Sequence, residues 1–304
     1  MKKRILLSLL VVPGVFLVLL GCHSKPRVVW DAYLYRHTPV WRLAKAVWQQ
    51  DTAQIRYLIK EKGMDVNYPE PTWGYTLLGS SVAINALLST EVLLECGADP
   101  NAKIGPGTAG DGLITTPVLI ASHYIESNND PTYLELMLKY GGDPNAYEYG
   151  DGPRRNYSTA IGIAGLGGIG YLRPLIEAGA DVNFIAPGNK INFGSEAMMN
   201  AFAPKVAEGG RFVYKYDAML YLIEQGGDVN AYRIIEGQEQ NLLWRLRRIF
   251  QIPLDSEEHR LKMQVVDSLM KRGLNYWEYP VPEVVKKSIM KQHPTDWEEF
   301  LQKY

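Results

Sequence analysis

GADPN at residues 97–101 is one of five near-copies of a single phrase. Each copy has a glycine, an aspartate two residues later and an asparagine two residues after that. The other copies are GMDVN (63–67), GGDPN (141–145), GADVN (179–183) and GGDVN (226–230), with a degenerate sixth, RGLN, at 272–275. An apolar run with Leu or Ile at i, i+3 and i+4 precedes each copy, which predicts a helix with one buried face. Helices that end in a fixed turn every 34–47 residues predict a solenoid of stacked repeats.

The residue types of the phrase suit a turn at a helix end. The first glycine takes the left-handed position that ends a helix, since it lacks a Cβ. Aspartate and asparagine hydrogen-bond to nearby backbone and redirect the chain. The predicted turn residues are Gly63, Asp65, Asn67, Gly97, Asp99, Asn101, Gly141, Asp143, Asn145, Gly179, Asp181, Asn183, Gly226, Asp228 and Asn230.

A second motif opens the first helix of each predicted unit. Residues 116–121 read TPVLIA and residues 159–164 read TAIGIA, with weaker versions at 76–79 and 241–244. Threonine is a good N-cap, and proline suits the first turn of a helix. With the repeated phrase, these motifs resemble ankyrin repeats, although the histidine of that family's T-P-L-H-x-A motif is missing throughout. The resemblance covers residues 38–277 and implies an all-α solenoid of about six helix-pair repeats with extended loops.

GLGGIG at 165–170 matches the dinucleotide-binding pattern G-x-G-x-x-G. That pattern requires a strand before it and an acidic residue roughly 20 positions later. Residues 162–164 belong instead to a predicted helix, and Asp181 comes too soon and is already the turn aspartate. We therefore expect small residues that let two helices approach or loosen their joint. Pro174 is expected to kink or delay the second helix of this unit.

The first 22 residues predict a processed leader. MKKR is followed by an apolar run and by Leu19-Leu20-Gly21-Cys22, which resembles a bacterial lipobox. The resemblance implies a signal peptide at 1–21, lipid attached to Cys22, and an anchor and tether at 22–37. His23 and Ser24 stand where inner-membrane lipoproteins commonly carry Asp, which implies the inner leaflet of the outer membrane and a body in the periplasm. An uncleaved anchor helix and an ordinary signal peptide are the alternatives.

The tail at 278–304 reads as a C-terminal helical cap of two short helices. Thr295 and Glu298 form a predicted capping box. Trp297, Phe300 and Leu301 are expected to face the last repeat and shield its apolar side from water.

Composition and motifs give no sign of catalysis, metal or cofactor. The net charge of −1 gives no argument for nucleic acid as a partner. The five histidines show no metal-ligand spacing, and no nucleophile motif occurs. Cys96 is expected to be a small buried side chain, and with Cys22 acylated it has no partner for an intramolecular disulfide.

Residues beyond the minimal repeat length form loops, which we expect on one face of the stack. They lie at 103–114, 146–157, 184–194 and 231–240, and a further stretch at 203–217 separates the two helices of the fifth repeat. Tyrosine and arginine, which anchor protein interfaces, are frequent in them. The predicted partner contacts are Tyr147, Tyr149, Arg154, Arg155, Tyr157, Phe193, Arg211, Tyr214 and Tyr216. For any one tyrosine, packing over its neighbours is the alternative role.

Ankyrin-repeat lipoproteins of this size resemble immunity proteins that bacteria pair with phospholipase toxins of type VI secretion. The resemblance implies a periplasmic lipoprotein that neutralises a secreted lipase toxin by covering its active-site cleft. An envelope scaffold, or a stress-protection partner of another periplasmic protein such as a peroxide-detoxifying enzyme, is the alternative. An enzyme built on the loops is a third interpretation.

Overall fold

Helices in antiparallel pairs make up most of the molecule. The computed structural model describes residues 31–105, 108, 112–123, 130–150, 157–206 and 212–304. The first helices of the pairs are α1 (Trp41–Trp48), α3 (Leu77–Ala83), α5 (Pro117–His123), α8 (Ala160–Gly167), α10 (Glu196–Ala201) and α12 (Leu242–Leu246). The second helices are α2 (Thr52–Lys60), α4 (Leu87–Glu95), α7 (Thr132–Lys139), α9 (Ile169–Glu177), α11 (Tyr216–Glu224) and α13 (Glu257–Met270).

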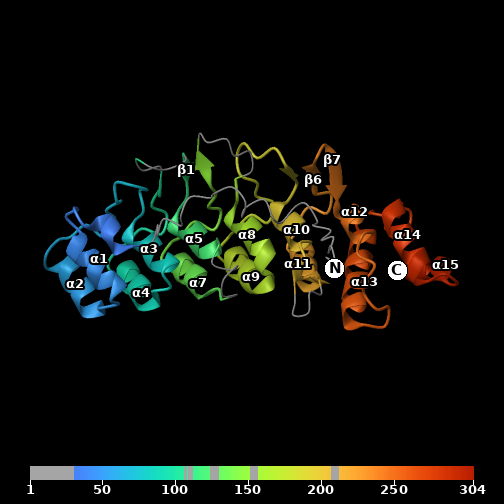
Figure 1. Ribbon diagram of the computed structural model, residues 1–304, viewed down its shortest axis with the longest axis horizontal. Helices are drawn as coiled ribbons and strands as arrows, with labels where there is room; N and C mark the ends of the chain where they lie inside the picture. Colours follow the sequence, from blue (N-terminus) through green and yellow to red (C-terminus); the bar gives the residue numbers. More distant parts are fainter. Residues whose placement is uncertain (1–30, 106–107, 109–111, 124–129, 151–156, 207–211) are drawn as a thin grey trace, which may run out of the picture.

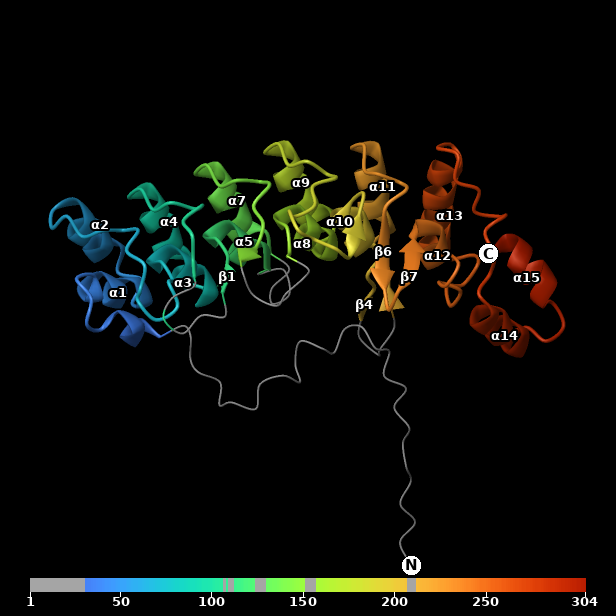
Figure 2. The ribbon, with the colours of Figure 1, turned by 90° about the horizontal axis from the view of Figure 1, so that it is seen from above.

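The pairs stack in chain order into a curved solenoid, with the second helices in one row and the first helices in another (Figures 1 and 2). The 3-10 helix η1 (Ala32–Tyr35) precedes the stack, and α14 (Glu283–Gln292) and α15 (Trp297–Lys303) follow it. One apolar core runs from Tyr35 to Tyr276 through all six pairs. The predicted helix-pair solenoid is therefore confirmed for the described residues.

Most first helices begin at a polar residue whose side chain caps the helix. The side-chain oxygens of Thr76, Thr159 and Asn241 accept the N–H three residues later at 3.3, 2.9 and 2.8 Å. Ser195 caps α10 in the same way at 3.2 Å, although its sequence does not resemble the motif. These bonds satisfy backbone donors that the first turn leaves unpaired, so they define where each helix starts.

The turns confirm the roles predicted for glycine and aspartate. Gly97 has a φ of 91°, and the first glycines of the other copies are also left-handed. The carboxylate of Asp99 accepts the N–H of Asn101 at 2.8 Å, and each of the other four copies has the same bond. Aspartate thus fixes the shape of the turn from within.

The asparagines act between repeats rather than locally. The side-chain oxygen of Asn101 accepts the N–H of Asp143 at 2.7 Å, and its amide donates to the carbonyl of Gly141 at 2.9 Å. Asn67 and Asn183 join the next turns through the same two bonds, and Asn145 accepts from Asp181 at 2.8 Å. The expectation of a purely local role was wrong, because the amide reaches the following copy of the phrase. We call this series the asparagine ladder.

GLGGIG spans the joint between α8 and α9, as expected, and no strand enters it. α8 ends at Gly167, Gly168 has a φ of 88°, and α9 begins at Ile169. A Cβ on Gly165 would lie 2.5 Å from the carbonyl oxygen of Ala197, so this glycine lets α8 approach α10. α9 continues through Pro174 to Glu177, so the expected delay of this helix is not found.

The C-terminal helices pack on the loop between α12 and α13. Val285, Ile289, Phe300 and Tyr304 form a small separate core, against which Trp297, Leu301 and the loop residues Phe250 and Leu254 pack. The fully buried ammonium of Lys262 donates to Ile249 O at 3.0 Å and Tyr304 O at 3.2 Å, and the Tyr276 hydroxyl donates to Tyr304 O at 2.6 Å. The N-cap of α15 is Asp296 and makes no side-chain bond, so the predicted capping box of Thr295 and Glu298 is wrong.

Cys96 caps the C-terminus of α4 and is half-buried. It is thus more accessible than the buried side chain we expected.

Candidate protein-binding surface

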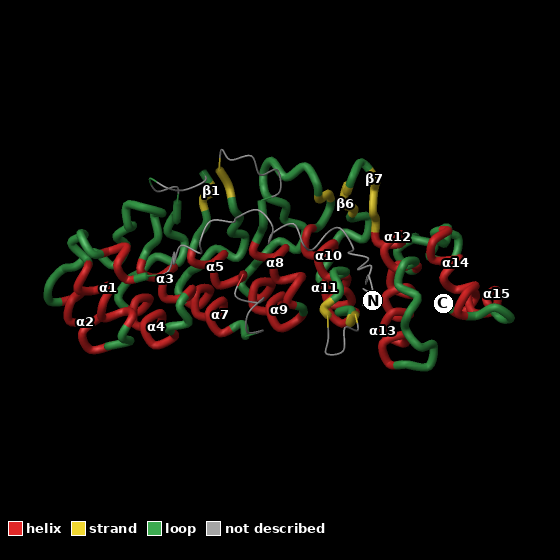
Figure 3. The backbone as a smooth tube through the Cα atoms, viewed as in Figure 1, coloured by secondary structure: helices red, strands yellow, loops and turns green. Residues whose placement is uncertain are grey.

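The loops after the turns form short strands that pair from one repeat to the next. We call the loops at 102–115, 146–159, 184–195 and 231–241 the fingers. β1 (Leu113–Ile114) pairs antiparallel with β2 (Tyr149–Gly150) of the following finger. β3 (Asn192–Phe193) pairs in the same way with β6 (Tyr232–Ile235), which forms a hairpin with β7 (Gln238–Asn241). In Figures 1 and 3 these strands stand on one side of the helix rows.

Aromatic side chains of the finger at 146–159 gather into one cluster. The Tyr147 ring lies 5.7 Å from that of Tyr149 and 5.8 Å from that of Phe184, which belongs to the next finger. The Tyr157 hydroxyl donates to Gly150 O at 2.6 Å, and the Lys103 ammonium lies over the Tyr149 ring. All three tyrosines are half-buried, so each is fixed by neighbours while part of its surface meets solvent.

A second aromatic pair lies where β3 meets β6. Phe193 and Tyr232 stack with their ring centroids 4.7 Å apart and an angle of 8° between their planes. Both rings are half-exposed. We call Tyr147, Tyr149, Tyr157, Phe193 and Tyr232 together the finger surface.

The loop between α10 and α11 leaves the opposite end of its helix pair. It contains the hairpin of β4 (Lys205–Val206) and β5 (Phe212–Val213), which Figure 3 shows below α11, across the helix rows from β6 and β7. The expectation that all inserted loops share one face is therefore wrong. This loop joins the first helix to the second, so it lies at the end of the pair away from the fingers.

Two predicted contacts lie at this other end. Tyr214 is half-buried beside a pocket of about 170 Å³, which Phe212, Phe250 and Pro253 also line. Tyr216 is only 1% exposed, because it opens α11 and its ring belongs to the core. We therefore correct the prediction for Tyr216, which cannot reach a partner in this conformation. Arg154, Arg155, Arg211 and Cys22 lie outside the described residues.

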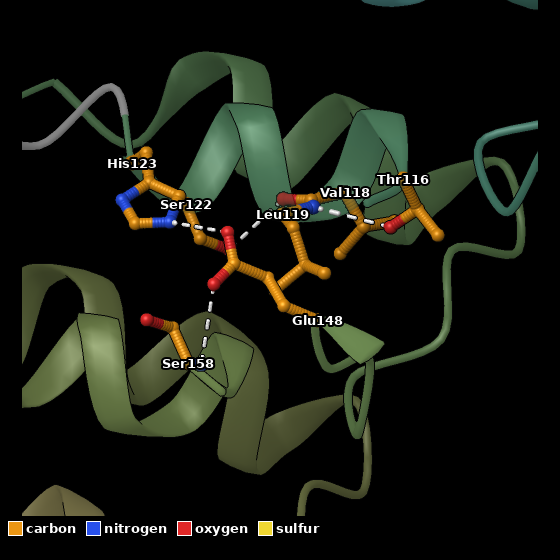
Figure 4. A network of polar contacts seen from close by, with 7 residues as sticks. All are labelled: Thr116, Val118, Leu119, Ser122, His123, Glu148 and Ser158. Carbon is orange, nitrogen blue, oxygen red and sulfur yellow. Dashed lines mark hydrogen bonds and ion pairs between the residues drawn. The ribbon is translucent and has the colours of Figure 1, made fainter. Parts of the chain in front are cut away.

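Buried polar groups support the fingers from beneath. Glu148, 7% exposed, accepts the N–H of Ser158 at 3.3 Å, and its other oxygen lies 3.6 Å from Nε2 of His123 (Figure 4). Glu148 precedes β2, while His123 ends α5 of the preceding pair. The contact thus ties a finger to the helix row below it, consistent with the rule that buried polar groups have partners.

A second network lies under the finger at 231–241. The carboxyl of Glu196, 3% exposed, accepts the hydroxyl of Thr159 at 2.9 Å. Burial raises its pKa to about 7, against the opposing effects of Thr159 and the nearby Arg233 guanidinium. Arg233 also donates to the side-chain oxygens of Asn192 and Asn200, so β6, β3 and α10 are joined.

Within the described residues, no group of three His, Cys, Asp or Glu side chains is arranged to hold a metal ion. Over the same ranges, no helix has both the length and the apolar character needed to cross a membrane. The fingers present aromatic contact area with polar groups at its edges.

The sequence matches no protein-family model and no curated protein. Solved structures do resemble it. The ankyrin repeat protein EF0377 is 22% identical, with a TM-score of 0.50, over 76% of this chain and 98% of its own. An ankyrin repeat domain from Acinetobacter baumannii AYE is 22% identical, with a TM-score of 0.53, over 76% and 97% of the two chains. The chain has the ankyrin-repeat fold.

A third ankyrin-repeat structure, that of Bcl-3 of the IkappaB protein family, is 21% identical with a TM-score of 0.50, over 77% of this chain and 86% of its own. These identities establish the fold alone.

The pairing of neighbouring fingers was not predicted from the sequence. Phe184 and Tyr232 lie in predicted loops but were not among the predicted partner contacts, although both contact a predicted residue. The alternation of Tyr232, Arg233 and Ile234 on either side of a strand was the available signal.

Proposed function

We propose that the chain is a protein-binding scaffold that covers its partner with the finger surface. The observation that carries this proposal is the arrangement of partly exposed aromatic rings, each held by a neighbouring ring, cation or backbone carbonyl. Fixed aromatic side chains supply large contact area and lose little conformational freedom on binding. The proposal assigns the chain no catalytic role.

We further propose that the partner is a secreted lipase toxin and that the chain is its immunity protein. The support is the resemblance to immunity lipoproteins, together with the LLGC sequence that ends at Cys22. In this proposal, lipid on Cys22 holds the chain at the inner leaflet of the outer membrane, facing the periplasm. A tethered binder there meets an incoming lipase before the enzyme reaches its membrane substrate.

Inhibition would follow from occlusion of the lipase cleft. Fingers that project from a rigid stack reach into a concave site, while the helix rows keep their spacing fixed. A preorganised surface avoids the ordering cost that weakens flexible binders. Tight neutralisation then depends on a few desolvated aromatic anchors, of which Tyr149 and Phe193 are the best placed among the described residues.

The binding proposal is tested by affinity capture from periplasm, followed by mass spectrometry and measured affinity for the recovered protein. We expect Tyr149→Ala and Phe193→Ala each to weaken binding by about tenfold or more, the loss typical of an interface anchor. Tyr57→Ala is the matched control, because Tyr57 is an exposed tyrosine on α2, in the row of second helices and outside the finger surface. Equal affinity of all three variants would exclude the finger surface as the binding site.

The immunity proposal is tested by deleting the gene and growing the strain beside its toxin-secreting siblings. We expect the deletion strain to be killed and expression of the intact chain to protect it. Normal growth beside siblings would reject the toxin proposal. Capture of a non-toxic envelope protein would instead favour the scaffold alternative.

The anchor is tested separately. Cys22→Ser is expected to abolish incorporation of labelled fatty acid and to release the chain from the membrane fraction. Label that persists on Cys22→Ser would exclude Cys22 as the site of lipidation, and an unlabelled variant that stays in the membrane fraction would exclude the lipid as the anchor.

A further inference from the structure

Neighbouring fingers pair in the same way at two of the three junctions between them. The last strand of one finger pairs antiparallel with the first strand of the next, as β1 does with β2 and β3 with β6. The second pairing continues past the named strands, because the N–H of Ile234 donates to Ile191 O at 2.9 Å. At these junctions, a finger receives an extended segment on its C-terminal side.

The last finger has no successor. Its final strand, β7, pairs with β6, and among the described residues no strand pairs with the outer edge of β7. After α13 the chain passes directly to α14 and α15 instead of forming another finger. Figure 1 shows β7 as the last labelled strand before these C-terminal helices.

The register identifies the backbone groups on that outer edge. Ile234 is directly opposite Glu239 in the hairpin. Since the N–H of Ile234 points away from β7 toward Ile191, the N–H and C=O of Glu239 point away from β6. Glu239 is exposed, so this donor and acceptor face the place where the next strand would lie.

The surroundings of the edge define what an added strand would carry. A pocket of about 260 Å³ lies beside it, where the polar residues Asn230, Glu239 and Asn241 meet Tyr232 and the apolar residues Val229, Leu242, Leu243 and Leu274. Glu236, in the hairpin turn, is also exposed. An apolar side chain suits the pocket, and Lys or Arg suits the two carboxylates.

We propose that the outer edge of β7 binds an extended segment of the protein partner, antiparallel to Gln238–Asn241, with an apolar residue in the adjacent pocket and basic residues opposite the glutamates. This inference rests on the proposed protein-binding function and adds a second mode of contact to it. Main-chain pairing with an exposed sheet edge gives affinity, and the pocket gives specificity.

A second copy of this chain is a less suitable occupant. Two β7 edges paired antiparallel about Glu239 would place the Glu239 side chains of the two copies directly opposite each other. Like charges facing each other across strands are destabilising, and charged edge strands oppose self-association. Charge thus favours a basic segment from a different protein.

The probe for this edge is a displayed library of random linear peptides, selected on the intact chain. Glu239→Pro removes the outward N–H but leaves the β6–β7 ladder its own bonds, because residue 239 does not donate to β6. Glu239→Gln is the matched control, since it keeps the backbone edge and removes only the charge. We expect selected peptides rich in alternating apolar and basic residues, with affinity reduced about tenfold or more by Glu239→Pro and far less by Glu239→Gln.

A second measurement needs no variant. Hydrogen exchange on the wild-type chain is expected to show protection of the Glu239 amide when a selected peptide is added. Peptides that bind wild type and Glu239→Pro equally, with no protection at Glu239, would overturn the inference. Concentration-dependent dimers that Glu239→Pro abolishes would also overturn it, by making a second copy the occupant.

Failure of the β7-edge inference can be distinguished from failure of the proposed protein-binding function. A captured partner that loses affinity with Phe193→Ala but not with Glu239→Pro would leave the finger surface intact as a binding site and reject the edge alone.

Discussion

The backbone N–H of Asp143 donates to the side-chain oxygen of Asn101 at 2.7 Å, across 42 positions of the chain. The same asparagine returns a bond to Gly141 O. A residue that the sequence places in a local turn thus holds two repeats together. The repeated phrase is therefore both a helix terminator and a joint between units.

The asparagines of the repeated phrase are expected to contribute unequally to stability. Asn101→Ala is expected to lower the free energy of unfolding by about 1–3 kcal/mol, because it removes two hydrogen bonds and leaves their backbone partners to be satisfied by water. Asn230→Ala is the matched control, since Asn230 is exposed and ends the ladder, and it is expected to change stability by less than about 0.5 kcal/mol. Urea unfolding measures both, and equal losses would contradict the ladder's role.

Alanine substitutions at two glycines of GLGGIG are expected to change the stability of the fold in opposite directions. A Cβ at Gly165 meets the backbone of Ala197, so Gly165→Ala should destabilise the fold by about 1–3 kcal/mol. Gly170 lies in α9 with open space around its Cβ position, so Gly170→Ala should stabilise it by about 0.5–1 kcal/mol. Thermal unfolding distinguishes them. Equal shifts of the two melting temperatures would argue against close packing of α8 on α10.

Glu196 is expected to make stability depend on pH. Its pKa in the folded chain is raised to about 7 from an ordinary 4.5, so the folded state favours the neutral carboxyl. The stability that the fold gains from the neutral carboxyl is fully present below about pH 4.5 and is lost as pH rises through about 7. Glu196→Gln keeps the acceptor for Thr159 and removes the titration, so we expect it to exceed wild type in stability by about 1–3 kcal/mol near pH 8.

The same variant should differ little from wild type at about pH 4, where both side chains are neutral. Glu61→Gln, at an exposed position after α2, controls for loss of surface charge. Parallel stability curves for wild type and Glu196→Gln across this pH range would contradict the assignment.

The C-terminal cap is expected to loosen without the Tyr276 hydroxyl. Tyr276→Phe removes its bond to Tyr304 O and should cost about 1 kcal/mol. Hydrogen exchange should accelerate in α15 while α3 and α4 keep their protection. Tyr279→Phe removes a half-buried hydroxyl nearby and serves as the control. Uniform acceleration along the stack would show a global rather than a local effect.

Local chemistry explains why the repeats were predictable. Glycine at a helix end, aspartate in the turn and threonine before a helix each act on backbone within a few residues, so the phrase encodes them directly. The six helix pairs follow from this periodicity. Ser195 was missed because its cap works with no other part of the motif present.

Contacts between repeats were not predictable from the phrase. The reach of Asn101, the close approach at Gly165 and the pairing of β3 with β6 all depend on how neighbouring units stack. The candidate surface was likewise predictable only in part. Tyr147, Tyr149 and Phe193 were selected by composition, but composition did not distinguish them from the buried Tyr216, whose place is set by the packing of α11.

The asparagine ladder also bears on how such a chain lengthens or shortens. Within the ladder, each linked pair of turns is bridged by one asparagine side chain that contacts only the next turn, so a duplicated or deleted unit preserves the chemistry of these turn junctions on either side. At the degenerate copy, Asn275 takes the place of the aspartate and Trp277 that of the asparagine, and the series of interchangeable junctions ends there. Gain or loss of whole repeats is therefore best tolerated before the degenerate copy of the phrase. The segment that follows this copy is expected to be kept or lost as a whole.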